Sequence, residues 1–295
     1  MCTAVSFGPA GRWFGRNLDL EYFGGETLTL LPRRAEVRFR AAGHLARHAA
    51  LLGVARVVDG RALYYDAMNE HGLAMASLRF PGCAHYLPST GSAREVASFE
   101  LTEFLLCRCA SLSEARRALT GLRITDEAFS ASLPPTPLHW MLSDGRASLV
   151  IEATKAGLQV YDNPTGVLTN APEFPWHQRN LTRFSPLQPH ERAFGLPGDY
   201  TSEARFVRAA FVRESSLCEK AQELSQLFHI LRAVEIPRGC VRTEADEAFF
   251  TRYTGCCDLE QLTYHILTYD SFGVRSACMH GADLDGTAPK QLLAL

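Results

Sequence analysis

The chain has 295 residues, of which 46% are hydrophobic, so it can bury a substantial core as one large or two small domains. Its 30 lysines and arginines nearly balance its 32 aspartates and glutamates, and the net charge of -2 argues against binding to nucleic acid. Export signals and apolar segments of membrane-spanning length are both missing from the sequence. We therefore expect a cytoplasmic protein that binds neither nucleic acid nor a membrane.

The N-terminal residues predict a β-hairpin. Residues 3–7 and 12–18 have strand character, and the Gly-Pro-Ala-Gly sequence at 8–11 is typical of a turn. If Phe7 pairs with Arg12, Cys2 lies opposite Asn17 and shares its face with Asp19. Arg16 then points to the other face, unless a β-bulge brings it back.

The middle of the chain predicts helices followed by strands. Residues 98–122 have helical patterning, with a capping box at Ser111 and Glu114 and a stop at Gly121. From Pro137 onwards the sequence changes to short β-rich runs separated by turns, which predicts an antiparallel meander. Its strands are expected at 138–142, 148–151, 158–161 and 166–169.

The last third repeats this order. Thr201 is placed to cap a helix that ends near Glu214, and apolar residues at helical spacing predict another at 221–234. Residues 262–269 and 274–279 read as a terminal hairpin. With no repeat or linker in the sequence, we expect one domain, residues 1–295, with two antiparallel sheets between helical layers.

The nine cysteines predict free thiols in a reducing compartment. Cys107 and Cys109, and likewise Cys256 and Cys257, are too close for the usual pairs of zinc ligands, so buried structural thiols are favoured over a metal site. Nucleotide-binding loops, zinc-protease helices and serine-nucleophile motifs are absent from the sequence. No metal or cofactor is expected.

Cys2 becomes chemically distinctive if Met1 is removed, which aminopeptidases do when the second residue is small. The mature chain then begins with a thiol and an α-amine on one residue. An α-amine titrates near pH ~7.7–8, so it can take the thiol proton and later return it to a leaving amine. A thiolate also forms more readily beside a fixed cation, for which Arg16 is the candidate. On spacing alone, an ordinary surface ion pair between Arg16 and Asp19 is favoured.

Several motifs, in order along the chain, resemble the choloylglycine hydrolase family, which contains bile salt hydrolases and penicillin V acylases. They are Met1-Cys2-Thr3, residues 14–22 (FGRNLDLEY), 66–73 (DAMNEHGL), 138–141 (LHWM), 166–172 (GVLTNAP), 176–177 (WH), 195–199 (GLPGD), 204–206 (ARF) and 228–231 (FHIL). The resemblance implies a four-layer αββα fold of the N-terminal nucleophile hydrolase type. It also implies hydrolysis of an amide through an acyl-enzyme.

The resemblance further implies roles for five residues. Cys2 matches the nucleophile, and Arg16 and Asp19 match the pair that supports the thiolate and orients the terminal amine. Asn170 matches the oxyanion-hole asparagine, a neutral donor suited to a developing oxygen charge. Arg205 matches the remaining active-site arginine. Without the resemblance, Asn170 would be read as a turn residue and Arg205 as an ordinary helix cation.

Two positions depart from the family pattern. Arg79 stands where bile salt hydrolases usually carry asparagine and penicillin V acylases tyrosine. Its backbone N–H could serve the oxyanion, and its guanidinium could bind an anionic substrate group, repel Arg16 or face solvent. The family's assembly loop is shortened between Trp176 and Gly195, so a homo-oligomer is expected, either the family tetramer or a dimer.

The preferred hypothesis is hydrolysis of the glycine or taurine amide of conjugated bile salts, because an apolar pocket suits a sterol acyl group. Penicillin V acylase activity is the runner-up, and transfer of the acyl group to another amine stays open. A different class is a catalytically silent protein that binds amphipathic ligands. A thiol enzyme that uses Cys83 or Cys107 with a histidine has no local sequence signature.

Overall fold

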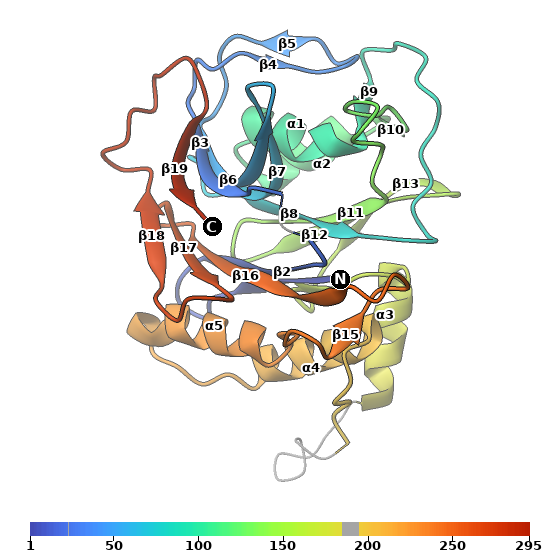
Figure 1. Cartoon of the computed structure of the whole chain (residues 1–295), viewed down its shortest axis with the longest axis vertical. Coiled ribbons are helices and arrows are strands. Elements are labelled where there is room, and N and C mark those ends of the chain that lie inside the picture. Colours follow the sequence, from blue (N-terminus) through green and yellow to red (C-terminus); the bar gives the residue numbers. More distant parts are fainter. Residues whose placement is uncertain (23, 185–194) are drawn as a thin grey trace.

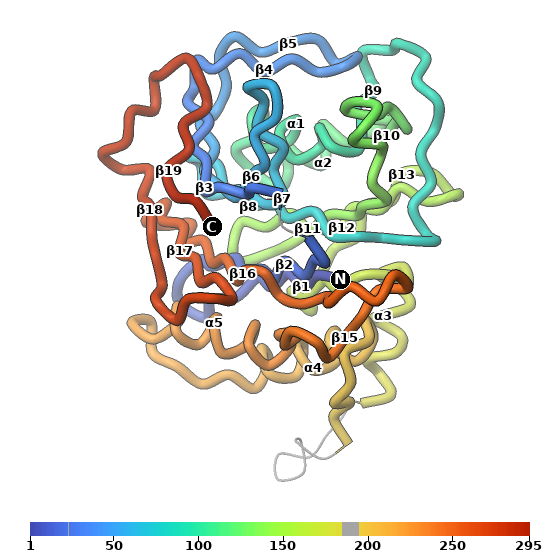
Figure 2. Tube along the Cα trace, viewed as in Figure 1, coloured from blue at the N-terminus to red at the C-terminus, as the bar shows by residue number. Residues whose placement is uncertain are grey.

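The computed structural model describes residues 1–22, 24–184 and 195–295. Two large antiparallel sheets lie face to face, and helices cover the outer face of each (Figure 1 and Figure 2). The four-layer αββα architecture expected from the sequence is therefore confirmed. The described helices include none that is long and apolar enough to cross a membrane.

The first sheet carries the N-terminus and has seven strands in the described residues. Their order across the sheet is β14, β1, β2, β16, β17 and β18, and β15 pairs with β16. The bounds are β14 (Val167–Leu168), β1 (Cys2–Phe7), β2 (Trp13–Leu20), β16 (Ala248–Asp258), β17 (Thr263–Thr268), β18 (Arg275–Cys278) and β15 (Val241–Arg242).

The second sheet has eight described strands in the order β13, β12, β11, β8, β7, β6, β3 and β19. The bounds are β13 (Gly157–Asp162), β12 (Ser148–Thr154), β11 (Leu138–Ser143), β8 (Ala74–Arg79), β7 (Arg61–Asn69), β6 (Leu51–Val58), β3 (Thr27–Leu31) and β19 (Lys290–Ala294). Two small pairs lie outside both sheets: β4 (Val37–Arg38) with β5 (His44–Leu45), and β9 (Glu95–Ala97) with β10 (Arg123–Thr125).

Helices α1 (Leu101–Arg108) and α2 (Leu112–Leu119) lie on the outer side of the second sheet, where α1 packs on β7 and β8 (Figure 1). Helices α4 (Ser202–Glu214) and α5 (Glu223–Arg232) cover the outer face of the first sheet, and α3 (Phe174–Leu181) packs on α4. Short 3₁₀ turns occur at η1 (Ser98–Glu100), η2 (Thr182–Phe184) and η3 (Lys220–Gln222).

The capping residues predicted from the sequence begin these helices. Ser111 Oγ accepts a hydrogen bond from the backbone N–H of Glu114 at 3.2 Å, and Thr201 caps α4 in the same way through Ala204. Gly121 follows α2 with a φ of +68°, a conformation that glycine adopts without strain. The terminal hairpin is also confirmed, because β17 and β18 pair antiparallel.

The register of the N-terminal hairpin differs from the prediction by one residue. Phe7 pairs with Trp13 instead of Arg12, so Cys2 lies opposite Leu18 and Ala4 opposite Arg16. Residues that pair share a face, so Arg16 lies on the face of Cys2 without any bulge in this hairpin, and Asp19 lies on the opposite face. The predicted faces of these two residues were therefore wrong.

A contact with α5 explains the extra residue in the turn. The carboxylate of Glu223 accepts hydrogen bonds from the backbone N–H groups of Ala10 and Gly11 and from the Trp13 indole. Arg12 lies outside the ladder, and its guanidinium donates to the backbone oxygens of residues 72 and 144. The turn is therefore set by Glu223, more than 200 positions away, as well as by its own glycines.

The predicted four-stranded meander is only partly correct. Strands β11, β12 and β13 pair in sequence, but β14 crosses to the first sheet, where Leu168 pairs with Ala4. The crossover begins at the turn after Asn163, whose side chain bonds the backbone at Gly166 and Val167. It brings the segment that follows β14 to the start of β1.

Every strand in the middle of the second sheet is buried on both faces. Leu52 packs between the two sheets, whereas its neighbour Leu51 packs against the helical layer of α1 and α2. Cys107, Cys109, Cys256 and Cys257, predicted as structural thiols, are buried and free. Residues 185–194, within the segment predicted to hold a shortened assembly loop, lie outside the described residues.

Candidate active site

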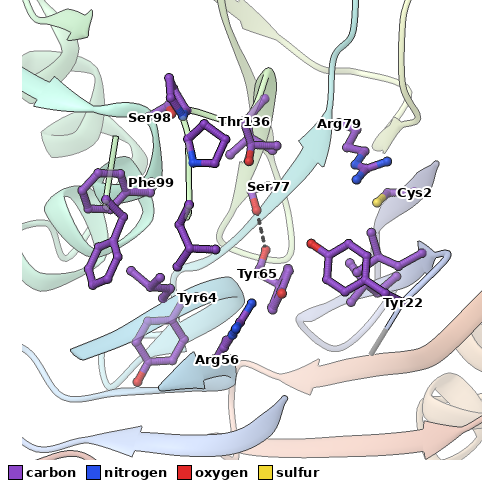
Figure 3. Close-up of a pocket in the computed structure, with 18 residues that line it drawn as sticks. Cys2, Tyr22, Arg56, Tyr64, Tyr65, Ser77, Arg79, Ser98, Phe99 and Thr136 are labelled. Atoms are coloured by element: carbon purple, nitrogen blue, oxygen red, sulfur yellow. Dashed lines mark hydrogen bonds between the residues drawn. The ribbon is translucent and has the colours of Figure 1, made fainter. Parts of the chain in front are cut away.

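Cys2 is the first residue of β1 and is buried, with 2% of its surface exposed. Its side chain borders a cavity of about 160 Å³ between the two sheets (Figure 3). Most of the lining is apolar or aromatic, and the polar exceptions include Arg79 and Arg56. The lining also includes Leu18, Leu20, Tyr22, Tyr65 and Leu133. The thiol therefore lies at one end of an apolar space.

The backbone of Cys2 is held on both sides by side chains from distant parts of the chain. Its N–H donates to Asn170 Oδ1 at 2.6 Å, and its carbonyl accepts from Arg205 Nη1 at 2.6 Å. Arg205 Nη2 also donates to Asn170 Oδ1 at 2.8 Å, which closes the group. The structure thus brings together three of the residues predicted from the sequence.

The side chain and backbone of Asn170 are both fixed. Its backbone N–H donates to Ser202 Oγ at 2.9 Å, and its carbonyl accepts from His177 Nε2 at 2.9 Å. Its Nδ2 donates to the backbone carbonyl of Arg79 at 2.7 Å. Because Ser202 is the first residue of α4 and His177 lies on α3, the outer helices set the position of Asn170 beside Cys2.

Arg16 is a fully buried cation on the inner face of the first sheet, diagonal to Cys2 across the hairpin. Its Nη1 donates to the backbone carbonyl of Tyr65 at 3.0 Å and lies 3.5 Å from Asp66 Oδ1. Burial disfavours the charge, but Tyr253, Cys2 and Asp66 outweigh it, so the pKa of Arg16 is raised. Arg16 is therefore a permanent positive charge close to the thiol.

Asp19 lies on the opposite face of β2, under α4. Its Oδ1 accepts from Thr251 Oγ1 at 2.6 Å, and its Oδ2 lies 4.0 Å from Arg205 Nη1. Its backbone carbonyl accepts from the Met1 amine at 3.3 Å. Burial lowers the pKa of this amine to about 6, against the opposing influence of Cys2 and Asp19. An α-amine in this environment is mainly neutral at pH 7 and can accept a proton.

Arg79 lies where the cavity opens and is 36% exposed. Its guanidinium points toward Cys2 in Figure 3, and its two terminal nitrogens bond Glu21 at 3.0 and 3.4 Å. It also lines a second hollow, together with Met1, Asn170 and Arg242. Arg79 thus borders the site on two sides, although Glu21 already pairs its charge.

Four polar residues around the site had no role in the sequence prediction. Asp66 lies between the sheets with Tyr253 and Tyr264, and His177 supports Asn170. Asp66 and His177 occur in the motifs that resemble the family. Nothing in the sequence next to either residue indicates that it supports a nucleophile. A polar side chain within an apolar, doubly buried strand is the signal that could have singled out Asp66.

His177 predicts an acid-sensitive fold. Burial is the main cause that lowers its pKa to about 4, compared with about 6.5 in the unfolded chain. The folded state therefore binds this proton less readily, so its stabilising effect is complete above pH 6.5 and is lost as the pH falls toward 4. Urea unfolding at pH 7 and at pH 4.5 measures the free energy of unfolding. Between these two pH values it should fall by about 2–3 kcal/mol more for the native chain than for His177→Gln. Equal losses in the two proteins would contradict this role.

The fold and site define this chain as a hydrolase of the N-terminal nucleophile fold with a cysteine at the first strand. It matches the sequence profile described as linear amide C–N hydrolases, choloylglycine hydrolase family, over residues 2–292. The chain belongs to the choloylglycine hydrolase family and is a hydrolase that acts on linear amide C–N bonds.

Named relatives match over nearly the full chain. A bile salt hydrolase/transferase from Lactiplantibacillus plantarum is 37% identical over 307 residues, 97% of this chain and 95% of the relative. One from Clostridium perfringens is 33% identical over 316 residues, with 98% and 96% covered.

Two solved structures share the fold. The crystal structure of a mutant conjugated bile acid hydrolase from Clostridium perfringens has a TM-score of 0.91 and 31% identity, covering 99% of this chain and 96% of that one. Penicillin V acylase from Agrobacterium tumefaciens has a TM-score of 0.82 and 21% identity, covering 99% and 91%. The second likeness concerns the fold alone.

Proposed function

We propose that this chain hydrolyses the glycine or taurine amide of conjugated bile salts, with Cys2 as the nucleophile once Met1 is removed. The observation that carries the proposal is the position of Cys2. Its thiol borders an apolar cavity while its backbone nitrogen lies 2.6 Å from Asn170 Oδ1. Removal of Met1 converts that nitrogen into an α-amine already held beside the thiol.

The proposed reaction begins when this amine accepts the thiol proton and the sulfur attacks the amide carbonyl carbon. Arg16 stabilises the thiolate, and Asn170 donates to the oxygen on which negative charge develops. Arg205 and Asp19 keep the amine and Asn170 in place. The amine then returns the proton to the leaving nitrogen, and water hydrolyses the thioester to release the acid and restore Cys2.

An α-amine on Cys2 lies one residue further inside the fold than the amine of Met1. Burial disfavours the charged form of an amine, as it does for Met1, and the Cys2 amine would lie in the same region of the fold. It can then act as a base without help from a histidine. This supports a site in which nucleophile and base belong to one residue.

Bile salts are favoured as substrates for two reasons. The relatives that match this chain at 33–37% identity are named bile salt hydrolases, and the cavity beside Cys2 is mainly apolar. At about 160 Å³ the cavity is smaller than typical small-molecule pockets of ~300–1,000 Å³. A bound sterol would therefore extend beyond the cavity toward solvent-exposed lining residues such as Tyr22.

Arg79 has two proposed roles that follow from its position. Its backbone carbonyl orients the Asn170 amide. Its guanidinium, paired with Glu21, forms a charged rim between the cavity beside Cys2 and the second hollow, which Met1 also lines. An anionic leaving group such as glycine or taurine would lie on this side. A catalytically silent binding protein is the alternative in which Arg79 has disabled the oxyanion site.

A side-by-side assay tests the proposal. Purified protein is expected to lack Met1 by intact mass and to hydrolyse glycocholate or taurocholate faster than penicillin V. Preference for penicillin V would assign the chain to the runner-up activity. Failure on all three substrates by protein with a free N-terminal Cys2 would favour the silent binder. Added amines would reveal acyl transfer, an activity that the names of the two bile salt hydrolase/transferase relatives include.

The cytoplasmic location, the single domain and the homo-oligomeric assembly, either tetramer or dimer, stay predictions. Size-exclusion chromatography with light scattering measures the assembly directly.

A further inference from the structure

Asp66 is a fully buried carboxylate that joins the two sheets. It lies on β7 of the second sheet, yet both of its oxygens accept hydrogen bonds from the first sheet. Tyr253 Oη on β16 donates to Oδ1, and Tyr264 Oη on β17 donates to Oδ2. The pKa of Asp66 is raised, because burial outweighs the opposing influence of Arg16 and the two tyrosines. Each oxygen of the carboxylate therefore has a tyrosine donor among the described residues.

The tyrosine pair limits how strongly Asp66 can bind Arg16. A charge-assisted bond between a guanidinium and a carboxylate is usually ~2.7–2.9 Å long, but Arg16 Nη1 lies 3.5 Å from Asp66 Oδ1. Nη1 makes its hydrogen bond to the carbonyl of Tyr65 instead. The Tyr253 ring also lies 5.9 Å from the guanidinium carbon. Arg16 is held in place without being neutralised by a bidentate ion pair.

Two nitrogens of Arg16 remain available. Nε and Nη2 are buried and have no hydrogen-bond partner among the described residues. Buried guanidinium donors rarely stay unpaired unless a functional partner uses them. Cys2 shares the inner face of the hairpin with Arg16 and acts on its charge. The two unpaired nitrogens of Arg16 are therefore candidates to stabilise the Cys2 thiolate.

We propose that Tyr253 and Tyr264 are positioning residues, which occupy both oxygens of Asp66 so that Arg16 keeps its free donors for the Cys2 thiolate. The inference rests on the proposed role of Cys2 and adds the residues that tune the charge of Arg16. Without either hydroxyl, the freed oxygen of Asp66 would draw the guanidinium into a closer ion pair. The thiolate would then lose part of its stabilisation.

Gly255 belongs to the same group of residues. It pairs with Arg16 across β16 and β2, and a Cβ at this position would overlap Tyr264 Oη. Only the absence of a side chain lets the tyrosine hydroxyl cross β16 to reach Asp66. Gly255→Ala therefore displaces the Tyr264 hydroxyl without removing it.

Other charged groups also act on Cys2 or on the adjoining amine. They come from separate elements and are unchanged by these substitutions: Asp19 on β2, Arg79 on β8 and Arg205 on α4. Any change in thiol reactivity can thus be assigned to the group around Asp66.

The test follows alkylation of Cys2 by iodoacetamide across pH 5–9 in the processed chain, read as modification of the N-terminal peptide by mass spectrometry. Tyr264→Phe is expected to move the midpoint of the profile up by about one pH unit and to slow alkylation at pH 7 about tenfold. Gly255→Ala should move it in the same direction. The readout needs no substrate, so its outcome is independent of whether bile salts are hydrolysed.

Tyr161→Phe is the matched control, because Tyr161 lies on β13, where it packs against Phe174 and contacts neither Asp66 nor Arg16. It should leave the profile unchanged. If Tyr264→Phe does not fold, Tyr253→Phe frees the other oxygen and should give the same shift. An unchanged midpoint in a folded variant, with only a lower melting temperature, would overturn the proposal and leave the tyrosines a structural role.

Discussion

Replacing Cys2 with alanine is expected to abolish amide hydrolysis, with a loss of about 10⁴-fold or more in kcat. Alanine is small enough for Met1 still to be removed, so the variant keeps the α-amine and loses only the sulfur. The backbone bonds of this residue to Asn170 and Arg205 do not involve its side chain, and the fold should be kept. Initial rates with the best bile salt, together with intact mass, measure the effect.

Cys83→Ala is the control for the alternative in which a different cysteine is the nucleophile. Burial raises the pKa of Cys83, and it raises the pKa of Cys107 more strongly, so neither forms a thiolate readily at pH 7. Cys83→Ala should therefore keep full activity. The mechanism would fail if Cys2→Ala stayed active, or if fully active protein were found to retain Met1.

The site was easier to predict from the sequence than the geometry that builds it. Cys2, Asn170 and Arg205 are expected together from the family resemblance, and the structure places them within hydrogen-bonding distance. Their spacing in the chain gives no such indication, because β14 must leave the second sheet to bring Asn170 to β1. A crossover of this kind depends on packing between layers, which local turn preferences do not contain.

The faces of Arg16 and Asp19 show the same limit. A turn of four residues was the natural reading of Gly-Pro-Ala-Gly, and one additional residue reverses the face of every side chain that follows. The longer turn is held by Glu223, on a helix far along the chain, which accepts from the backbone N–H groups of Ala10 and Gly11. Hairpin existence was thus predictable from local sequence, whereas its register was not.

Strands β6 to β8 were missed for another physical reason. Both faces of the second sheet are covered, so Leu51 and Leu52 are equally buried and the alternation that marks a half-exposed strand is absent. In such a sheet a polar residue is the exception. The sequence could therefore have indicated that Asp66 is unusual. It could not have indicated its partners, Tyr253 and Tyr264, which follow almost 200 residues later.

Replacing Asn170 is the second change with a large expected effect, and two variants separate its possible roles. Asn170→Ala removes both the acceptor for Cys2 and the donor for the oxyanion, and kcat should fall about 10²–10³-fold. Asn170→Asp keeps an oxygen for the Cys2 amine and for Arg205 Nη2 but loses the amide donor and adds a negative charge. If the donor is what matters in the transition state, the aspartate variant should lose as much activity as alanine.

The control for loss of a buried asparagine is Asn69→Ala. Asn69 bonds the backbone around α1, on the other side of the second sheet, so its loss should lower the melting temperature and leave kcat of the folded fraction unchanged. Near-normal turnover by Asn170→Asp would instead mean that Asn170 acts only by holding the amine and Arg205. The oxyanion would then need another donor, for which the backbone N–H of Arg79 is the candidate at the cavity rim.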